Sequence, residues 1–291
     1  MKTFNIFWLA LILALGLFSC DSSRTDKPKK KNKEDNNQAT STGEVKILEK
    51  WEMPNMLREV SGIAYLDENH FACVQDEAGV VFIYNIAKNR IESEVDFGAS
   101  GDYEGIALVN DIAYVVRSDG KIFEINDITS GSPHIKEYAT HLTVKNNVEG
   151  ITYDRKNNRL LLAIKGDESD DADFKGIYAF DLNAKKLSKT PVYKIDLNDS
   201  VFADSKAKKL GSRMQPSEIA VHPTTGDIYV LEGTNPQLLV LDDQGSIKHR
   251  YNINGTGFSQ PEGMTFNPAG DLFISNEGKK EKGNILKVQI N

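Results

Sequence analysis

Three glutamates stand at the same place in a short phrase that recurs along this sequence. Glu104, Glu149 and Glu262 are each followed by a glycine and an apolar residue. Two further copies of the phrase carry a serine at this place, Ser61 and Ser217. Carboxylates about 6 Å apart repel by about 2.8 kcal/mol at an effective dielectric constant of 20. If the five positions meet, the glutamates need a partner of opposite charge, either basic side chains or a bound hard cation.

A second set of polar residues ends the segment that follows each phrase. Its members are Gln75, Arg117, Lys165, Glu232 and Asn276, and one residue later come Asp76, Ser118 and Glu277. Arg117 and Lys165 belong to the copies that carry Glu104 and Glu149, so they could neutralise these acids by ion pairing. Glu218 lies one residue out of register, where the other copies have glycine, and we expect its side chain to point to another face.

A calcium ion is the alternative partner for these carboxylates. Ca²⁺ takes about six to eight oxygen ligands from carboxylates, carbonyl groups and water. The candidate ligands are Glu104, Glu149, Glu262, Glu232, Glu277 and Asp76. The serine hydroxyls could supply part of the shell. A third interpretation is a polar plug that does no more than fix the order of the repeats.

The spacing of the phrases indicates the elements that would bring these side chains together. The copies start 43, 45, 68 and 45 residues apart, and a period of about 40–45 residues filled by short strands is typical of propeller blades. No segment shows a sustained helical apolar stripe. We therefore predict an all-β fold, a five-bladed β-propeller. The first strand of each blade would line the central channel, with the glutamate or serine just before it at the channel mouth.

The ends of the repeat region predict how the propeller closes. The last repeat has three strands, and Val45–Trp51, ahead of the first repeat, is expected to be the missing fourth. This pairing would remove two exposed strand edges. The 68-residue gap is expected to hold two insertions, Asp167–Lys175 in the third blade and Leu197–Gln215 before the fourth. The acidic part of the first lacks the glycine and distal glutamate of an EF-hand, which favours a solvated loop.

The first 43 residues differ in composition from the rest. The apolar run Ile6–Phe18 is short for a membrane span, and its Leu-Phe-Ser-Cys ending resembles the lipobox of bacterial lipoproteins. By that resemblance, residues 1–19 are a signal peptide. Cys20 would carry the lipid that anchors the protein in the bacterial cell envelope, at the inner or outer membrane. Residues 20–43 are polar and are predicted to form a disordered tether, which leaves residues 44–291 for the propeller.

Other features exclude several classes of function. The net charge of −7 comes without a basic stripe, so nucleic acid is not an expected partner. The sequence contains no G-x-S-x-G or H-E-x-x-H motif. Cys73 is the only cysteine besides Cys20, which predicts a buried thiol and no disulfide framework. We expect a monomer.

The repeats also carry a resemblance to a known family. V-S-G-I-A-Y at 60–65, Y-E-G-I-A at 103–107, V-E-G-I-T-Y at 148–153 and the stretch 215–231 resemble the SdiA-regulated (YjiK-like) family of bacterial envelope proteins. The resemblance spans residues 44–291. It implies a five-bladed propeller, distantly related to NHL repeats, with calcium in a central site. Glu104, Glu149 and Glu262 are its candidate ligands here, while Ser61 and Ser217 depart from a ring of five glutamates.

Two functions of different classes follow. The first is a binding or interaction module that presents its surface to a protein, peptide or glycan. The second is a calcium-dependent hydrolase, such as a lactonase, phosphoesterase or phytase-like enzyme, in which the metal polarises the substrate and a carboxylate acts as base. Phytase-like chemistry needs more basic residues than Arg117, Lys165 and Arg213 provide. We therefore favour the binding module and leave open whether the protein is an enzyme.

Overall fold

The computed structural model describes residues 44–129, 132–169, 172–253, 255 and 257–291. The predicted signal peptide, Cys20 and the predicted tether lie outside the described residues. Strands form every long element, and the helical segments of this part are four short 3-10 turns: η1 (Asn55–Leu57), η2 (Arg155–Asn157), η3 (Ser200–Phe202) and η4 (Leu210–Ser212). No helix of the described part is long and apolar enough to cross a membrane.

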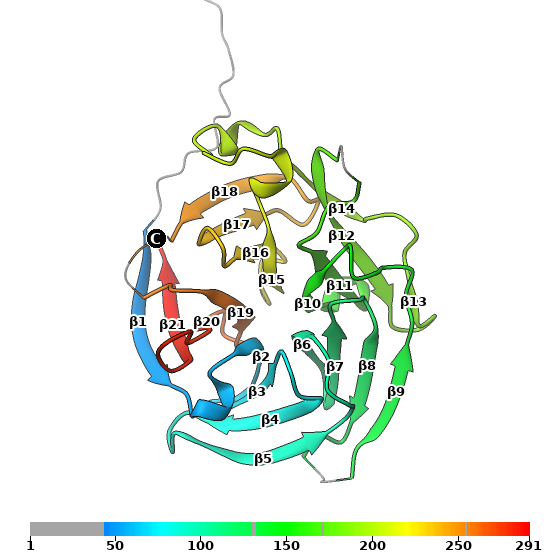
Figure 1. The fold of residues 1–291 in the computed structure, drawn as a ribbon, viewed down its shortest axis with the longest axis vertical. Coiled ribbons are helices and arrows are strands. Elements are labelled where there is room, and N and C mark those ends of the chain that lie inside the picture. The colour runs from blue at the N-terminus through cyan, green and yellow to red at the C-terminus, as the bar shows by residue number, and fades with distance from the viewer. Residues whose placement is uncertain (1–43, 130–131, 170–171, 254, 256) are drawn as a thin grey trace, which may run out of the picture. The chain divides into compact units, whose positions relative to one another are not determined.

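Five antiparallel sheets follow one another around a central axis, and each is one blade of a propeller (Figure 1). Blade 1 consists of β2 (Val60–Asp67), β3 (His70–Gln75), β4 (Val80–Asn85) and β5 (Arg90–Asp96). Blade 2 consists of β6 (Tyr103–Val109), β7 (Ile112–Arg117), β8 (Ile122–Asn126) and β9 (His134–Tyr138). Blade 3 consists of β10 (Val148–Asp154), β11 (Arg159–Ile164), β12 (Phe174–Asp181), β13 (Lys186–Leu187) and β14 (Tyr193–Asp196). Blade 4 consists of β15 (Pro216–Val221), β16 (Ile228–Glu232), β17 (Gln237–Leu241) and β18 (Ile247–Asn252). Blade 5 consists of β19 (Pro261–Phe266), β20 (Leu272–Asn276), β21 (Asn284–Ile290) and β1 (Val45–Glu52).

The ring closes through the strand that precedes the first repeat. β1 pairs antiparallel with β21, from Val45 opposite Ile290 to Glu52 opposite Asn284. The predicted five-bladed propeller and its closure by Val45–Trp51 are both confirmed. Both predicted insertions also lie where expected, because residues 165–173 separate β11 from β12 and residues 197–215 separate β14 from β15.

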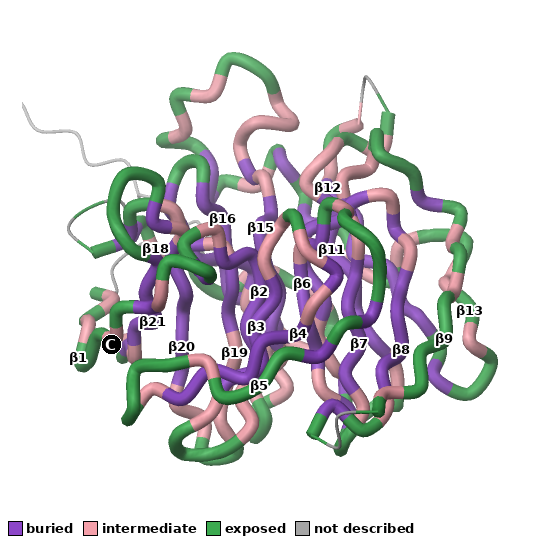
Figure 2. Tube along the Cα trace, turned by 60° about the horizontal axis from the view of Figure 1, so that its bottom comes forward, coloured by how far each residue is buried: buried purple, intermediate pink, exposed green. Residues whose placement is uncertain are grey.

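The hydrophobic core lies between neighbouring blades. Five clusters of buried side chains fill the five contacts around the ring, one of them formed by Val74, Phe97 and Tyr103 between blades 1 and 2. Each large side chain buried in this way contributes about 1.5–3 kcal/mol. Figure 2 shows the consequence, since the inner strands are buried whereas β5 and β9 are largely exposed.

All five inner strands share one irregularity at the recurring phrase. The strand register shifts between Val60 and Gly62, and it shifts at the same place in β6, β10, β15 and β19. The skipped residues are Ser61, Glu104, Glu149, Ser217 and Glu262. They were expected just before the strand, and they are instead bulges inside it. A bulge leaves one residue unpaired and redirects its side chain, which explains why this position varies between acid and serine.

Candidate functional site

In four of the five blades a glycine follows the bulge and lets the inner strands approach one another at the axis, whereas in blade 4 the following residue is Glu218. A Cβ on Gly150 would lie 2.7 Å from the backbone nitrogen of Ile219 in the next blade. A Cβ on Gly62 would lie 2.8 Å from the Cα of Gly105. Real Cβ contacts are longer than this, so the glycines are sterically required. The close approach brings the five bulges to one end of the channel.

Lys165 lies among the three glutamates of this end. Its ammonium is 3.2 Å from Oε2 of Glu149, whose Oε1 accepts a hydrogen bond from Asn147. Burial opposes the charged form of Lys165, but the negative charges of Glu149, Glu262 and Glu104 outweigh it and raise its pKa. The predicted ion pair between Lys165 and Glu149 is therefore present.

The glutamates outnumber the positive charge beside them. Burial, together with the nearby carboxylates of Glu149 and Asp102, raises the pKa of Glu104 to about 10. Burial also raises the pKa of Glu262 to about 7, although Lys165 opposes the rise. Burial raises the pKa of Glu149 as well, again against the effect of Lys165. At neutral pH this end of the channel therefore retains protons on carboxyl groups that a nearby cation would ionise.

Arg117 does not take part in this ion pairing. Its Nε and Nη2 donate to the two carboxylate oxygens of Asp119, at 3.0 and 2.6 Å. The predicted pairing of Arg117 with Glu104 is therefore wrong, because the turn after β7 supplies a closer, bidentate partner. Asp102, which sequence reasoning did not single out, lies beside Glu104 instead.

The two serines of the ring connect neighbouring blades. Ser61 Oγ donates to the carbonyl oxygen of Tyr103 in blade 2, at 2.7 Å. Ser217 Oγ donates to the carbonyl oxygen of Pro261 in blade 5, at 3.0 Å. Each hydroxyl therefore holds two inner strands together, and because serine is neutral the charged residues at the five bulges are the three glutamates.

Glu218 occupies the register position that is glycine in the other blades. Its Oε1 accepts hydrogen bonds from the backbone nitrogens of Ile151 and Ile219, both at 2.9 Å. The side chain is fully buried, and this burial raises its pKa well above the ordinary value. Oε2 is buried and has no hydrogen-bond partner among the described residues. Glu218 thus adds a fourth acid, which bridges the inner strands of blades 3 and 4.

The remaining predicted ligands lie in two different settings. Glu232 is buried and accepts hydrogen bonds from Gln215, Asn235 and Gln237, so it holds its own blade together. Asp76 in blade 1 and Glu277 in blade 5 are both influenced by the negative charge of Glu59, and Asp76 also by that of Glu277. Burial and these neighbours raise the pKa of Asp76 to about 6. A shallow depression lined by Asp76, Glu77 and Asp102 continues this acidic rim.

Residues 36–282 match the SdiA-regulated family. The chain belongs to that family. Comparison with curated proteins finds no match. Among solved structures, the chain is similar to glutaminyl cyclase from Myxococcus xanthus, with 13% identity, a TM-score of 0.56 and coverage of 85% of this chain and 96% of that one. It is also similar to a PQQ-bound aldose sugar dehydrogenase from Streptomyces coelicolor, with 12% identity, a TM-score of 0.52 and coverage of 87% and 100%. Such low identities establish a shared fold, and a fold hosts many functions.

The chemistry of this SdiA-regulated propeller suits a cation better than an anion. Carboxylate oxygens are the ligands that Ca²⁺ prefers, and four glutamates meet one lysine at this end. Among the described residues, however, no three His, Cys, Asp or Glu side chains are grouped closely enough to hold a metal ion. Lys165 already pairs with Glu149 among these acids. The side chains as they stand therefore form an acidic, ion-paired mouth.

Proposed function

We propose that this protein is a binding module of the bacterial cell envelope, tethered through a lipid on Cys20, and that it recognises a cationic ligand at the acidic end of its channel. Its fold and family support a binding or interaction module. Ca²⁺ is the ligand proposed first. A basic group presented by a protein or peptide partner would satisfy the same chemistry.

The surplus of acid at the mouth carries this proposal. The raised pKa values of Glu104 and Glu262, about 10 and 7, mean that both carboxyl groups lack sufficient positive charge. Each residue is half-buried, so solvent and ions reach it from the mouth. A cation would replace the protons and gain Coulomb energy in a site partly shielded from water.

Glu104, Glu149 and Glu262 would hold the calcium ion, with water and backbone carbonyl groups completing its shell. Lys165 would have to release Glu149, and its flexible four-carbon stem allows that movement. The lysine would then act as a competitor that sets the affinity. Proton release on binding follows from the raised pKa values.

The alternative of a hydrolase is favoured by one observation. The pKa of about 7 at Glu262 suits a general base at neutral pH. If lactones or phosphate esters are hydrolysed by the purified chain, Glu262→Gln should abolish the activity. A screen in which no such ester reacts, with and without Ca²⁺, would discard the hydrolase.

Calorimetric titration of the full chain with Ca²⁺ tests the main proposal. We expect saturable binding, at least tenfold weaker in Glu149→Gln, on the order of the loss of one buried charged contact, and tighter in Lys165→Met. Glu94→Gln is the matched control, because Glu94 is an exposed acid on β5. If neither the natural chain nor Lys165→Met binds Ca²⁺, the calcium site is refuted. A pull-down from envelope extract, with and without a chelator, then separates a calcium-dependent partner from direct recognition of basic groups.

The anchor has its own test. Cys20→Ser should release the protein into the soluble fraction, because the lipid would supply the membrane affinity. Continued membrane association of this variant after an alkaline wash would contradict the lipid tether.

A further inference from the structure

The five inner strands end at a hollow of about 500 Å³. The last residues of each inner strand line it, including Tyr65, Leu108, Tyr153, Val221 and Phe266. Glu149 and Tyr153 are four residues apart on β10, which places them about 13 Å apart along the strand. The hollow therefore opens at the end of the channel opposite to the acidic mouth. Small-molecule sites usually measure about 300–1,000 Å³.

The recurring phrase itself makes room for this hollow. The fourth residue of each copy is small: Ala64, Ala107, Thr152, Ala220 and Thr265, and all five line the cavity. The two threonines accept hydrogen bonds from the next inner strand, Thr152 Oγ1 from Val221 N and Thr265 Oγ1 from Tyr65 N. Their hydroxyl hydrogens remain able to donate toward a bound molecule.

Aromatic rings surround the opening and are held in fixed orientations. Tyr65 stacks against Phe273, with ring centres 5.9 Å apart. Phe266 packs edge to face against His222, with ring centres 4.9 Å apart. Nδ1 of His222 accepts hydrogen bonds from the backbone nitrogens of Thr224 and Thr225, so the neutral ring carries its proton on Nε2. Tyr65, His222 and Phe266 are only half-buried, which leaves ring surface available to a ligand.

The charges around the hollow cancel, unlike those of the acidic mouth. Lys156 pairs with Asp243 at 2.7 Å, and Asp154 of the lining pairs at 2.7 Å with Arg159, which lies just outside it. The two other charged residues of the lining, Asp111 and Arg155, are of opposite sign and are exposed. Neither side chain forms a hydrogen bond or ion pair with another described residue. The lining thus offers donors and acceptors without a net field that would attract an ion.

We propose that this hollow is a second binding site, which takes an uncharged, hydroxyl-rich small molecule of the size of a mono- or disaccharide. Such molecules have an apolar C–H face that packs on aromatic rings, and hydroxyls that pair with carboxylate, guanidinium and amide groups. The balanced charge disfavours phosphates and polyamines. The site is independent of the acidic mouth and of Ca²⁺.

Saturation-transfer NMR and calorimetry on the full chain test the proposal, with glucose, galactose, N-acetylglucosamine and maltose as probes. We expect one-to-one binding of at least one probe, unaffected by a chelator. Tyr153→Ala should weaken it about tenfold, as for an aromatic contact residue, and Tyr153→Phe should retain it. Asp111→Ala, on the exposed rim, should weaken binding about threefold without affecting the fold.

The following results overturn the proposal. The first is that none of the probes binds at concentrations up to about 50 mM, which limits any binding to a weak free energy. The second is that Tyr153→Ala and Asp111→Ala both bind a probe as tightly as the natural chain. The third is that binding of the sugar disappears when a chelator is added, which would assign the sugar to a metal at the acidic mouth.

Discussion

At one end of the central channel, Glu104, Glu149 and Glu262 project from bulges and share a single lysine. At the other end, the same inner strands finish in aromatic and small side chains around a hollow whose charges cancel. The two ends differ because the recurring phrase contains two kinds of position. Its first residue is unpaired and polar, and its fourth residue is paired and small. One phrase therefore determines both an ion-attracting mouth and a neutral cavity.

The glycine between these positions is common to both ends, and its loss should have the largest effect. Gly150→Val would place side-chain atoms against Ile219 N, where even a Cβ lies at 2.7 Å. We expect a loss of at least about 3 kcal/mol in unfolding free energy, typical of severe overpacking, measured by urea denaturation. Gly255→Ala is the control, since no atom lies within 4 Å of its Cβ position. Equal stability of both variants would show that the inner strands are not closely packed.

The next largest effect should come from the removal of one ion pair at each end, and the loss of stability should differ between the two ends. Lys165→Met leaves the buried Glu149 without its cation, and we expect a loss of about 1–3 kcal/mol at pH 8. Lys156→Met breaks the exposed pair with Asp243, which should cost far less because solvent screens both charges. Thermal denaturation of both variants gives the comparison. Similar losses would contradict the difference in burial between the two ends.

Glu104→Gln should stabilise the protein in alkaline solution. The folded-state pKa of about 10 lies above the ordinary value of 4.5, so the folded chain binds more protons than the unfolded chain between these values. Its stability therefore falls as pH rises above about 4.5. Glutamine cannot ionise, and we expect no gain at pH 4 and a gain of about 1–2 kcal/mol at pH 8. A gain that is the same at both pH values would argue against the raised pKa.

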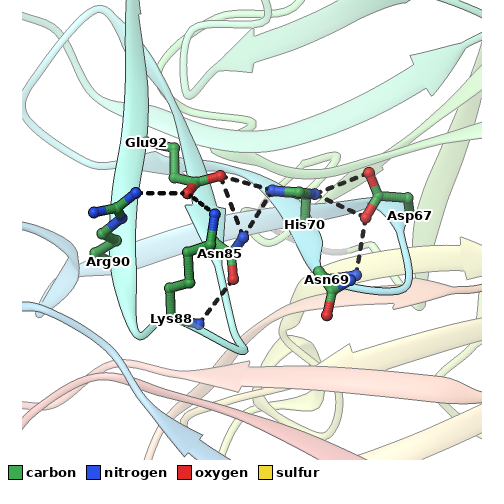
Figure 3. Close-up of polar contacts among 7 residues, drawn as sticks. All are labelled: Asp67, Asn69, His70, Asn85, Lys88, Arg90 and Glu92. Carbon is green, nitrogen blue, oxygen red and sulfur yellow. Dashed lines mark hydrogen bonds and ion pairs between the residues drawn. The ribbon is translucent and has the colours of Figure 1, made fainter.

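The smallest effect is expected at a surface network near the end of β2 (Figure 3). His70 lies between Asp67 and Glu92, at 2.8 and 2.9 Å. Hydrogen bonds to Glu92 and Asp67 raise its pKa, so its stabilising effect is complete below the ordinary value of 6.5 and is lost as pH rises through the folded-state value. His70→Gln should lower Tm by about 1–2 °C at pH 5.5. An equal decrease at pH 9 would indicate a contribution from packing rather than charge.

The propeller could be predicted from the sequence because every blade carries a copy of the same short phrase. Five similarly spaced phrases fix the number of blades, and a three-stranded last repeat leaves one place for Val45–Trp51. The prediction of Lys165 beside Glu149 succeeded because Glu149 follows Val148 and Lys165 follows Ile164, and Val148 and Ile164 are paired on adjacent strands of one blade.

Other features depend on geometry that residue types do not reveal. Asp119 accepts hydrogen bonds from Arg117 because the turn after β7 brings the Asp119 carboxylate back beside that strand. The bulges were not predicted, although a polar residue before glycine in four of the five phrases was their signal. The hollow could not be predicted because it results from side chains that are small, and small residues carry no chemical signal of a site in the sequence. Whether Ca²⁺ binds at the mouth stays a prediction.

The bulges also affect how such a protein can change over evolution. An unpaired residue contributes nothing to the hydrogen-bond ladder of its blade, so a substitution there alters one sector of the mouth and leaves the ladders of the five blades intact. Ser61 and Ser217 illustrate this freedom beside the three glutamates. With five separately replaceable positions, selection can adjust the charge and selectivity of the mouth one blade at a time, while the architecture is inherited unchanged.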